Sequence, residues 1–322
     1  MATVDRSYDD QRDRERVFDF LVDTHARLGR PHNWLIDRWI NLRYSHYADS
    51  DPVRPDNWQD EIHVWEEDDA IVAAVLREGA NLYAPQVDPA QLDLEPALLA
   101  WAEADHQARR PAEASDWPLR LEVYQWDTRR QAHLLARGYE QQPDHAVHRR
   151  RSLVDAVEAP ELPSGFKLRA MQGTAEAKQR YVETLGAIFP HYAAHWEKSY
   201  PNLSPKQRWK MAVRSTCPRQ EAPAYRRELD LCIETSKGAL AAVCTFWFDA
   251  RNELSIIEPM GVVPEHRGLG LSRAIMLEGM RRSRVLGARR VDTTSYAEPA
   301  HQAYESVGLQ SYEAIDLFSK HA

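Results

Sequence analysis

Two halves of this 322-residue chain show the same order of predicted elements, and this repeat limits the available folds more than any other feature. Gln86-Val87-Asp88-Pro89 corresponds to Gly261-Val262-Val263-Pro264, and Ala132–Tyr139 corresponds to Gln302–Leu309. In each half, hydrophobic periodicity predicts a strand, two helices, further strands, a helix, a strand, a helix and a final strand. The sequence therefore predicts two copies of one α/β unit.

The segment between the halves is typical of a linker. Ser152–Gly165 contains two prolines and ends in a glycine. We predict a first domain at residues 1–153, a linker at 154–165 and a second domain at 166–322.

Charge is distributed unequally between the halves. The chain has 41 Lys+Arg and 49 Asp+Glu, a net charge of −8. Residues 1–160 carry 19 Arg, no Lys and 31 acidic residues, or −12, whereas residues 161–322 carry 22 basic and 18 acidic residues, or +4. The acidic half argues against nucleic acid as a partner, and the mildly basic half suits a small phosphorylated ligand.

The sequence also argues against a membrane protein and against a secreted disulfide protein. No apolar run approaches the roughly 20 residues of a membrane-spanning helix, and the charged N-terminus does not resemble a secretory signal. Three cysteines, Cys217, Cys232 and Cys244, form neither a disulfide framework nor a metal-type spacing. We expect a cytoplasmic protein, as a monomer or a homodimer, without a membrane partner.

Periodicity and turn residues place the individual elements. In the second half they predict strands at Phe166–Met171, Leu229–Glu234, Leu240–Phe248, Leu254–Val263, Arg290–Tyr296 and Tyr312–Phe318. The strand Leu254–Val263 should have an irregularity at Pro259. They predict helices at Ala175–Ile188, Pro205–Arg214, Leu271–Leu286 and Pro299–Ser306. In the first half the predicted strands are Ala2–Ser7, Ile62–Glu66, Ala70–Arg77, Asn81–Val87 and Leu119–Gln125, and the predicted helices are Arg14–Leu28, Trp34–His46, Glu95–Arg109 and Thr128–Ala136.

The segment from Val262 to Ser272 carries the clearest chemistry. A strand ends, a loop with Gly268 and Gly270 follows, and a helix begins. Glycines let a ligand approach the backbone, and the N–H groups and dipole at a helix start favour an anion. Arg267 adds a positive charge, so the segment suits a pyrophosphate. It is not a GxGxxG dinucleotide motif, because Arg273 replaces the third glycine, and the chain has no GK[ST] motif.

The second half resembles the GCN5-related N-acetyltransferase (GNAT) superfamily over about Phe166–Lys320. The resemblance is carried by Val262, Val263, Pro264, Arg267, Gly268, Leu269 and Gly270, by Leu286-Gly287-Ala288, and by Ala300, Tyr304, Glu305 and Gly308. It implies two tandem domains of α/β (α+β) class, each with a mixed, mostly antiparallel central sheet flanked by helices. It also implies acetyl-CoA or another acyl-CoA as co-substrate. The residues expected to bind it are Gly261, Val262, Val263, Arg267, Gly268, Leu269, Gly270, Leu271 and Ser272.

The resemblance implies direct attack of an amine on a thioester. Tyr304 matches the position of a tyrosine that protonates the leaving thiolate. Glu258, a few residues before the loop, is our first choice for the general base, and Glu298 and His301 are rivals for this role. Backbone N–H groups of Gly261–Val263 match the donors to the thioester oxygen.

The resemblance also indicates where the acceptor binds. Tyr192, His195 and Trp196 correspond to a region that borders the acceptor, and Glu298 and His301 lie near the other side of the cleft. His191 and His195 share a helical spacing, but neither the glutamate of HExxH nor a third ligand is apparent, so we predict no metal site.

Several positions depart from the family pattern. Ala297 replaces a frequent Asn, and Glu265 replaces the Gln or Arg that often opens the phosphate loop. In the first half, the residues after Pro89 include carboxylates and no glycine, and Leu134 stands at the position of Tyr304. We therefore expect the first copy to be a degenerate, non-catalytic one that supports the second copy or walls its cleft.

The sequence thus predicts an N-acetyltransferase of this superfamily, acting on the primary amine of a small molecule. Three alternatives remain open: transfer of another short acyl or acyl-like group in antibiotic or secondary-metabolite chemistry, an enzyme similar to mycothiol synthase, and a non-catalytic acyl-CoA sensor or scaffold.

Overall fold

The first half of the chain forms one set of strands and helices. The computed structural model describes residues 3–32, 34–46, 57–78, 81–109, 117–190, 204, 217–296 and 298–321. Strands of the first half are β1 (Val4–Ser7), β2 (Ile62–Glu67), β3 (Ala70–Glu78), β4 (Leu82–Val87), β5 (Leu119–Tyr124) and β6 (Glu140–Ser152). Its helices are α1 (Asp10–Leu28), α2 (Ile36–Asn41), α3 (Glu95–Arg109) and α4 (Thr128–Ala136). These elements confirm most of the predicted ones, but the predicted helix Trp34–His46 is an α-helix only at Ile36–Asn41 and continues as a π-helical turn at Leu42–His46. Strand β6 is the one for which the sequence provided no range.

The second half repeats the order. Its strands are β7 (Phe166–Ala170), β8 (Asp230–Thr235), β9 (Leu240–Asp249), β10 (Leu254–Val262), β11 (Arg290–Ser295) and β12 (Gln310–Lys320). Its helices are α5 (Ala175–Ile188), α8 (Leu271–Val285) and α9 (Glu298–Glu305). The predicted helix Pro205–Arg214 lies outside the described residues. Residues 153–165, between β6 and β7, contain no helix or strand.

The described strands form one continuous sheet in which the two halves exchange their last strands. The order is β1-β2-β3-β4-β5-β12-β6-β11-β10-β9-β8-β7. Strand β12 of the second half pairs with β5 and β6 of the first, and β6 pairs with β11 of the second. Only the β4–β5 and β10–β11 pairs are parallel. The mixed, mostly antiparallel sheet confirms the predicted fold class.

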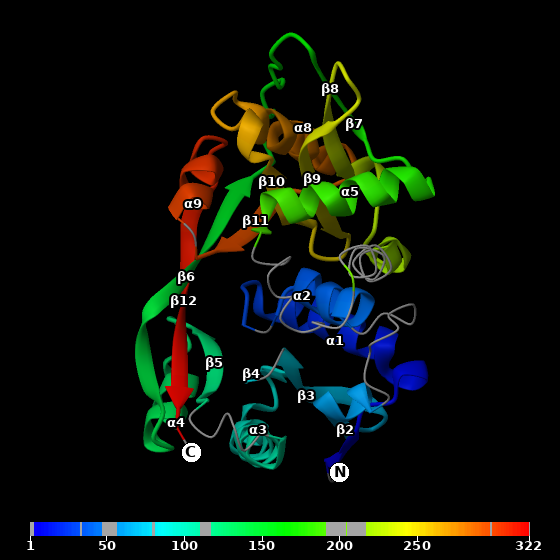
Figure 1. Cartoon of the computed structure of the whole chain (residues 1–322). Coiled ribbons are helices and arrows are strands. Elements are labelled where there is room, and N and C mark those ends of the chain that lie inside the picture. Colours follow the sequence, from blue (N-terminus) through cyan, green and yellow to red (C-terminus); the bar gives the residue numbers. More distant parts are fainter. Residues whose placement is uncertain are drawn as a thin grey trace.

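Helices α1 and α2 lie inside the curve of this sheet, between the two halves (Figure 1). One face of α1 and α2 packs with residues of β2, β3 and β4, such as Ile62 and Leu76. Another face packs on the second half through Ile36, Ile40, Trp247 and Ile256. The first copy therefore covers one face of the β9–β10 region of the second copy.

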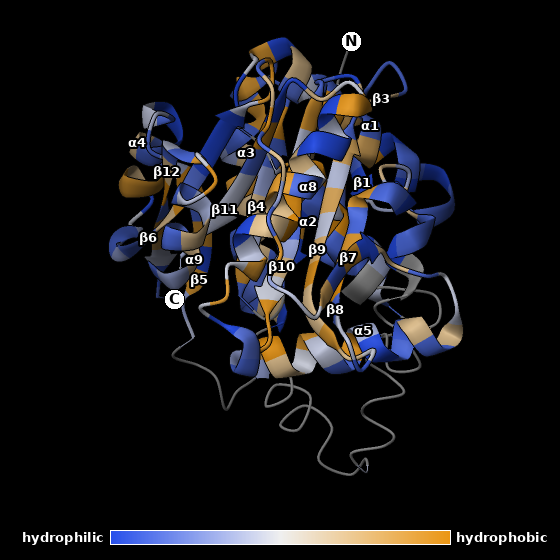
Figure 2. Ribbon diagram, turned by 90° about the horizontal axis from the view of Figure 1, so that it is seen from above, coloured by the Kyte–Doolittle hydropathy of each residue, from blue (hydrophilic) through white to orange (hydrophobic). Residues whose placement is uncertain are grey.

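Helix α8 covers the opposite face of that region. Phe246, Ile257, Ile275 and Met280 belong to the core cluster between α8 and the strands. All ten residues of β9 are buried, and hydrophobic colour follows this strand through the middle of the molecule in Figure 2. Gly279 permits the close packing, since a Cβ there would lie 2.0 Å from the Phe246 ring. Among the described helices, none is long and apolar enough to cross a membrane.

Candidate active site

The glycine-rich loop lies at the start of α8 as an open helix N-terminus. After β10, a short 3₁₀ turn at Pro264–His266 leads to Gly268 and Gly270, whose φ angles are +79° and +76°. Gly270 is the N-cap residue of α8, and no side chain caps the helix. The first N–H groups of a helix have no partner within the helix. This fifteen-residue helix therefore offers free donors and a positive dipole end, which fits the predicted pyrophosphate site.

Leu271 anchors the loop, and Leu269 and Arg267 remain accessible. Leu271 is buried in the core beneath α8, whereas Leu269 is exposed. Arg267 is exposed, and its Nε donates to the carbonyl oxygen of Val262 at 3.3 Å. Ser272 is partly buried in the first turn of α8. The arrangement leaves the Arg267 charge beside the helix start, where it would add to the attraction for a phosphate.

Strands β10 and β11 separate next to this loop. Their parallel pairing covers only Leu254–Ile256 against Arg290–Asp292, although β10 continues to Val262. Beyond that point, β10 pairs with β9 on one edge, and its pairing with β11 has ended. The Val263 N–H donates to the carbonyl oxygen of Ala241 at 3.0 Å, on the β9 side. Because backbone groups alternate between the two edges of a strand, it is Val262 whose backbone faces the split, where it could bind an amide group of a ligand. Gly261 is required by packing, because a Cβ there would lie 2.2 Å from Ile188 Cγ2.

Glu258 lies at a β-bulge in β10. The register with β9 shifts between Ile257 and Met260, which confirms the irregularity predicted at Pro259. Bulges redirect side chains and often lie next to active sites. Glu258 is only partly exposed, and its desolvation is the main reason why its pKa rises to about 7, with the negative charge of Asp37 adding to the effect. A carboxyl group with a pKa near the working pH is suited to general base catalysis.

Residues of the first copy surround this carboxyl group, and the sequence analysis did not predict them. Asp37 and Glu78 raise the pKa of Glu258, whereas Arg38 lowers it. Asp37 is itself desolvated, and its pKa rises to about 6. No local sequence signal could reveal this, because α2 and β3 meet β10 only through the folding of the two halves together.

Tyr304 approaches the same split from the α9 side. Its side chain is buried in the core cluster that includes Ile257 and Val291. Burial raises the pKa of its phenol, and the charge of Glu258 raises it further, while a hydrogen bond with Thr293 lowers it. The hydroxyl therefore stays protonated at neutral pH and can donate a proton or a hydrogen bond. The structure thus brings Tyr304 and Glu258 within electrostatic reach of each other.

The two rival bases form a local pair at the start of α9. His301 Nδ1 lies 3.3 Å from Glu298 Oε2, and His301 Nε2 lies 3.0 Å from the carbonyl oxygen of Ser295. The Glu298 side chain is largely exposed. Tyr192, His195, Trp196 and Ala297 lie outside the described residues, so their predicted roles stay predictions.

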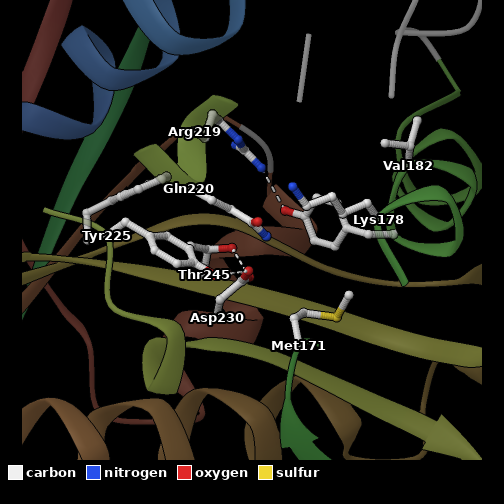
Figure 3. A pocket seen from close by; sticks show the side chains of 10 residues that line it. Met171, Lys178, Val182, Arg219, Gln220, Tyr225, Asp230 and Thr245 are labelled. Carbon is white, nitrogen blue, oxygen red and sulfur yellow. Dashed lines mark hydrogen bonds between the residues drawn. The ribbon is translucent and has the colours of Figure 1, made fainter. Parts of the chain in front are cut away.

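A small pocket lies near Glu258, between α5, β8, β9 and the 3₁₀ turn Cys217–Glu221. Trp247 lines it, and Trp247 Nε1 donates to the carbonyl oxygen of Glu258 at 2.7 Å. Figure 3 shows Arg219, Gln220 and Lys178 around the pocket, with Asp230 and Thr245 on the strands below. The full lining is Met171, Lys178, Tyr181, Val182, Arg219, Gln220, Tyr225, Asp230, Thr245 and Trp247. The sequence analysis named none of them.

The described part of the chain contains no group of side chains suited to bind a metal ion. There, no group of three or more His, Cys, Asp or Glu side chains could hold a metal ion. The free cysteines Cys232 and Cys244 are buried, and burial raises the pKa of Cys232 to about 11.

Comparisons with known proteins agree with this geometry. Residues 192–309 match the model of the acetyltransferase (GNAT) family. No curated protein matches the chain. The fold is similar to a tandem GNAT protein from the clavulanic acid biosynthesis pathway, with 16% identity, TM-score 0.64 and coverage of 99% of this chain and 98% of the other.

Two further solved structures cover the whole chain. A GCN5-related N-acetyltransferase from Sphaerobacter thermophilus has 17% identity, TM-score 0.60 and coverage of 99% of this chain and 95% of the other. A GNAT-family acetyltransferase from Colwellia psychrerythraea has 12% identity, TM-score 0.54 and coverage of 99% of both chains. The predicted resemblance and the tandem fold class are confirmed.

Proposed function

The chain has a tandem GNAT fold with a GNAT family segment at residues 192–309, and on this premise we propose that it is an acyl-CoA-dependent N-acyltransferase. The reaction we propose is acetyl transfer from acetyl-CoA to the primary amine of a small molecule in the second copy. The observation that carries the proposal is the β-bulge that holds Glu258, with a pKa of about 7, beside the split between β10 and β11.

The described residues fit an acyl-CoA at this split. The uncapped start of α8 with Arg267 would hold the pyrophosphate, and the edge of β10 at Val262 that no longer pairs with β11 would hold a pantetheine amide. When bound, the thioester supplies the activated acyl carbon. The mildly basic second half and the acidic first half agree with this placement.

The residues then divide the proton transfers between them. Glu258 accepts a proton from the acceptor amine, which frees the nitrogen lone pair for attack. The backbone N–H of Val262, at the edge of β10 that faces the split, donates to the carbonyl oxygen as its negative charge grows. Tyr304 donates its proton to the departing sulfur and regains one from the nitrogen of the tetrahedral intermediate, so a C–N bond forms, a C–S bond breaks and the free thiol leaves. Binding both partners side by side in the cleft supplies much of the remaining acceleration.

The test is thiol release from acetyl-CoA with a panel of small amines. We expect Tyr304→Phe to lower kcat by about 10²- to 10⁴-fold, because the thiolate must leave without its proton donor. Coenzyme affinity should change little. Tyr312→Phe, a change at a tyrosine of β12 on the surface, is the matched control.

Two outcomes would contradict the proposal. Tight coenzyme binding without thiol release on any amine would favour the sensor or scaffold. Equal activity of Tyr304→Phe and the native protein would remove the proton-donor role from Tyr304.

A further inference from the structure

Arg219 differs from the other buried arginines of the described chain. Four arginine side chains are buried: Arg43, Arg130, Arg149 and Arg219. The first three have a carboxylate partner, namely Asp10, Glu95 and Glu305 respectively. Arg219 forms no ion pair with a described carboxylate. A buried charge without a direct ion pair is costly, so the position is unusual.

The contacts of Arg219 are neutral. Its Nη2 donates to the Tyr181 hydroxyl at 2.8 Å, and its Nη1 lies 3.4 Å from Asn41 Oδ1 on α2 of the first copy. Its Nε is buried without a partner. The guanidinium is therefore held in place, with donor capacity left over.

A second cation lines the same pocket. Lys178 extends from α5 into the pocket beside Arg219 (Figure 3) and has no ion pair among the described residues. The pocket also contains Asp230, but its two oxygens accept from hydroxyl groups, Thr245 at 2.9 Å and Tyr225 at 3.0 Å. Two cations and one carboxylate leave the lining with an excess positive charge.

The excess charge lies next to the candidate base. Trp247 belongs to the pocket lining and bonds to the backbone of Glu258, and the Glu258 carboxylate is near enough to raise the pKa of Arg219. An acceptor whose amine meets Glu258 would therefore place its other end in the pocket. We propose that the acceptor carries an anionic group, a carboxylate or a phosphate, that binds between Arg219 and Lys178. This inference rests on the proposed acyl transfer and names the substrate class of the same site.

The test compares matched acceptors that differ in charge. The pairs are β-alanine with β-alaninamide, glycine with glycinamide, and 2-aminoethyl phosphate with ethanolamine. The measured quantity is the ratio of kcat/KM for the anionic member to that for the neutral member. Amine basicity differs within a pair, so each ratio is compared between the native protein and its variants at one pH. The two carboxylate pairs and the one phosphate pair show which of the two anions the protein prefers.

Arg219→Gln should lower this ratio by about 10- to 100-fold, because a hydrogen bond to a charged group contributes roughly that factor. Arg219→Lys keeps the charge and should retain part of the ratio. Lys178→Met should lower the ratio less, since Lys178 is less buried than Arg219. Lys237→Met, at an exposed cation in the turn between β8 and β9, is the matched control and should leave the ratio unchanged. If the ratio of kcat/KM for anionic and neutral acceptors is the same in the native protein and in all four variants, the proposal is overturned.

A binding measurement separates this inference from the proposed function. N-acetyl-β-alanine and N-acetylglycine, as product-like probes, should raise the melting temperature of the native protein and not that of Arg219→Gln. Stabilisation without turnover of any amine would refute acyl transfer and support the anion site. Turnover of the amines with neither stabilisation nor a change of ratio would support acyl transfer and refute the anion site.

Discussion

The two copies of the fold open at the same place and differ in what borders the opening. In the first copy, β4 and β5 pair in parallel only at Leu82–Tyr83 against Arg120–Leu121. In the second, β10 and β11 pair over three residues and then separate. The split between the strands is therefore a property of the fold, and a split by itself does not make a coenzyme site.

The loop after each split shows the first difference. In the first copy, the Asp88 side chain accepts from the N–H of Ala90 at 2.9 Å and pairs with Arg27 at 2.6 Å. Glu95 begins α3 and is buried against Arg130. Carboxylates thus occupy the positive end of that helix, whereas α8 has no acidic residue in its first turn and no side-chain cap. One helix start is filled by the protein itself, and the other is left for a ligand.

The strand before the loop shows the second difference. The register of β4 against β3 is continuous, whereas β10 has a shift between Ile257 and Met260, where Glu258 lies. Leu134 is buried in the first copy where the sequence places Tyr304 in the second. The first copy therefore lacks the counterparts of both candidate catalytic groups.

The first copy still contributes to the site of the second. Its Asp37, Arg38 and Glu78 act on the pKa of Glu258, and its Asn41 contacts Arg219. The first copy thus forms a wall beside Glu258 whose charges act on the pKa of that carboxyl group.

Glu258→Gln is expected to have the largest effect, because it removes from the second copy a carboxyl group that the first copy lacks. We expect kcat to fall by about 10² to 10⁴-fold, because an amide cannot accept the proton. In the native protein, kcat/KM should rise with pH through about 7, since the base acts in its deprotonated form. The variant should lose that rise. Thiol release measured between pH 5.5 and 9 tests both expectations.

Stability provides the control for this variant. Folding raises the pKa of Glu258 from 4.5 to about 7, so the native state loses stability as the pH rises through that range. Glu258→Gln should therefore be more stable than the native protein above pH 7. Glu253→Gln, at an exposed glutamate before β10, should change neither rate nor stability. Full activity of Glu258→Gln would move the base to Glu298 or His301.

Asp292→Asn tests the connection between the halves. Asp292 on β11 is fully buried and bonds to His148 Nε2 at 2.9 Å and to Arg150 at 2.8 and 2.7 Å, both on β6. Removing one partner from a buried ion pair costs about 3–5 kcal/mol. Urea unfolding should show a loss of this size.

The pH dependence adds a second measurement. Despite desolvation, the bonds from Arg150 and His148 lower the pKa of Asp292 from 3.8 to about 2. Its stabilisation is therefore present above pH 3.8 and is lost as the pH falls through about 2. Asp292→Asn should lose less stability over that range than the native protein. The exposed Asp155→Asn is the control, and a loss below about 0.5 kcal/mol for Asp292→Asn would contradict the expected coupling of the halves.

The smallest expected effect concerns the coenzyme loops. We expect calorimetry to show one molecule of coenzyme A bound per chain. Of the two helix starts compared, those of α3 and α8, only that of α8 is free of side-chain carboxylates. Arg267→Ala should weaken binding by about 10-fold, as for the loss of one charged contact. Arg129→Ala, beside the corresponding loop of the first copy, should have no effect. Binding of two molecules per chain, or a loss of affinity in Arg129→Ala, would show that the first copy also binds the coenzyme.

Most elements, and part of the candidate site, could be predicted from local sequence. The loop from Val262 to Ser272 and the irregularity at Pro259 depend on glycine, proline and helix-start chemistry, which act over a few residues. Strand β6 received no predicted range, because EQQPDHAVHRRRS has no apolar alternation. Its polar residues are instead paired with groups such as Asp292 on the neighbouring strand.

The sequence by itself determined the repeat and the glycine-rich helix start, because both depend on spacing along the chain, and its resemblance to the GNAT superfamily made Tyr304 and Glu258 candidates. Only the tertiary structure decided that the halves exchange β6 and β12 and enclose α1 and α2. The same packing desolvates Glu258 beside Asp37 and buries Arg219 without an ion pair to a described carboxylate. Desolvation and charge pairing depend on distances in space, and residues more than 100 positions apart set those distances here.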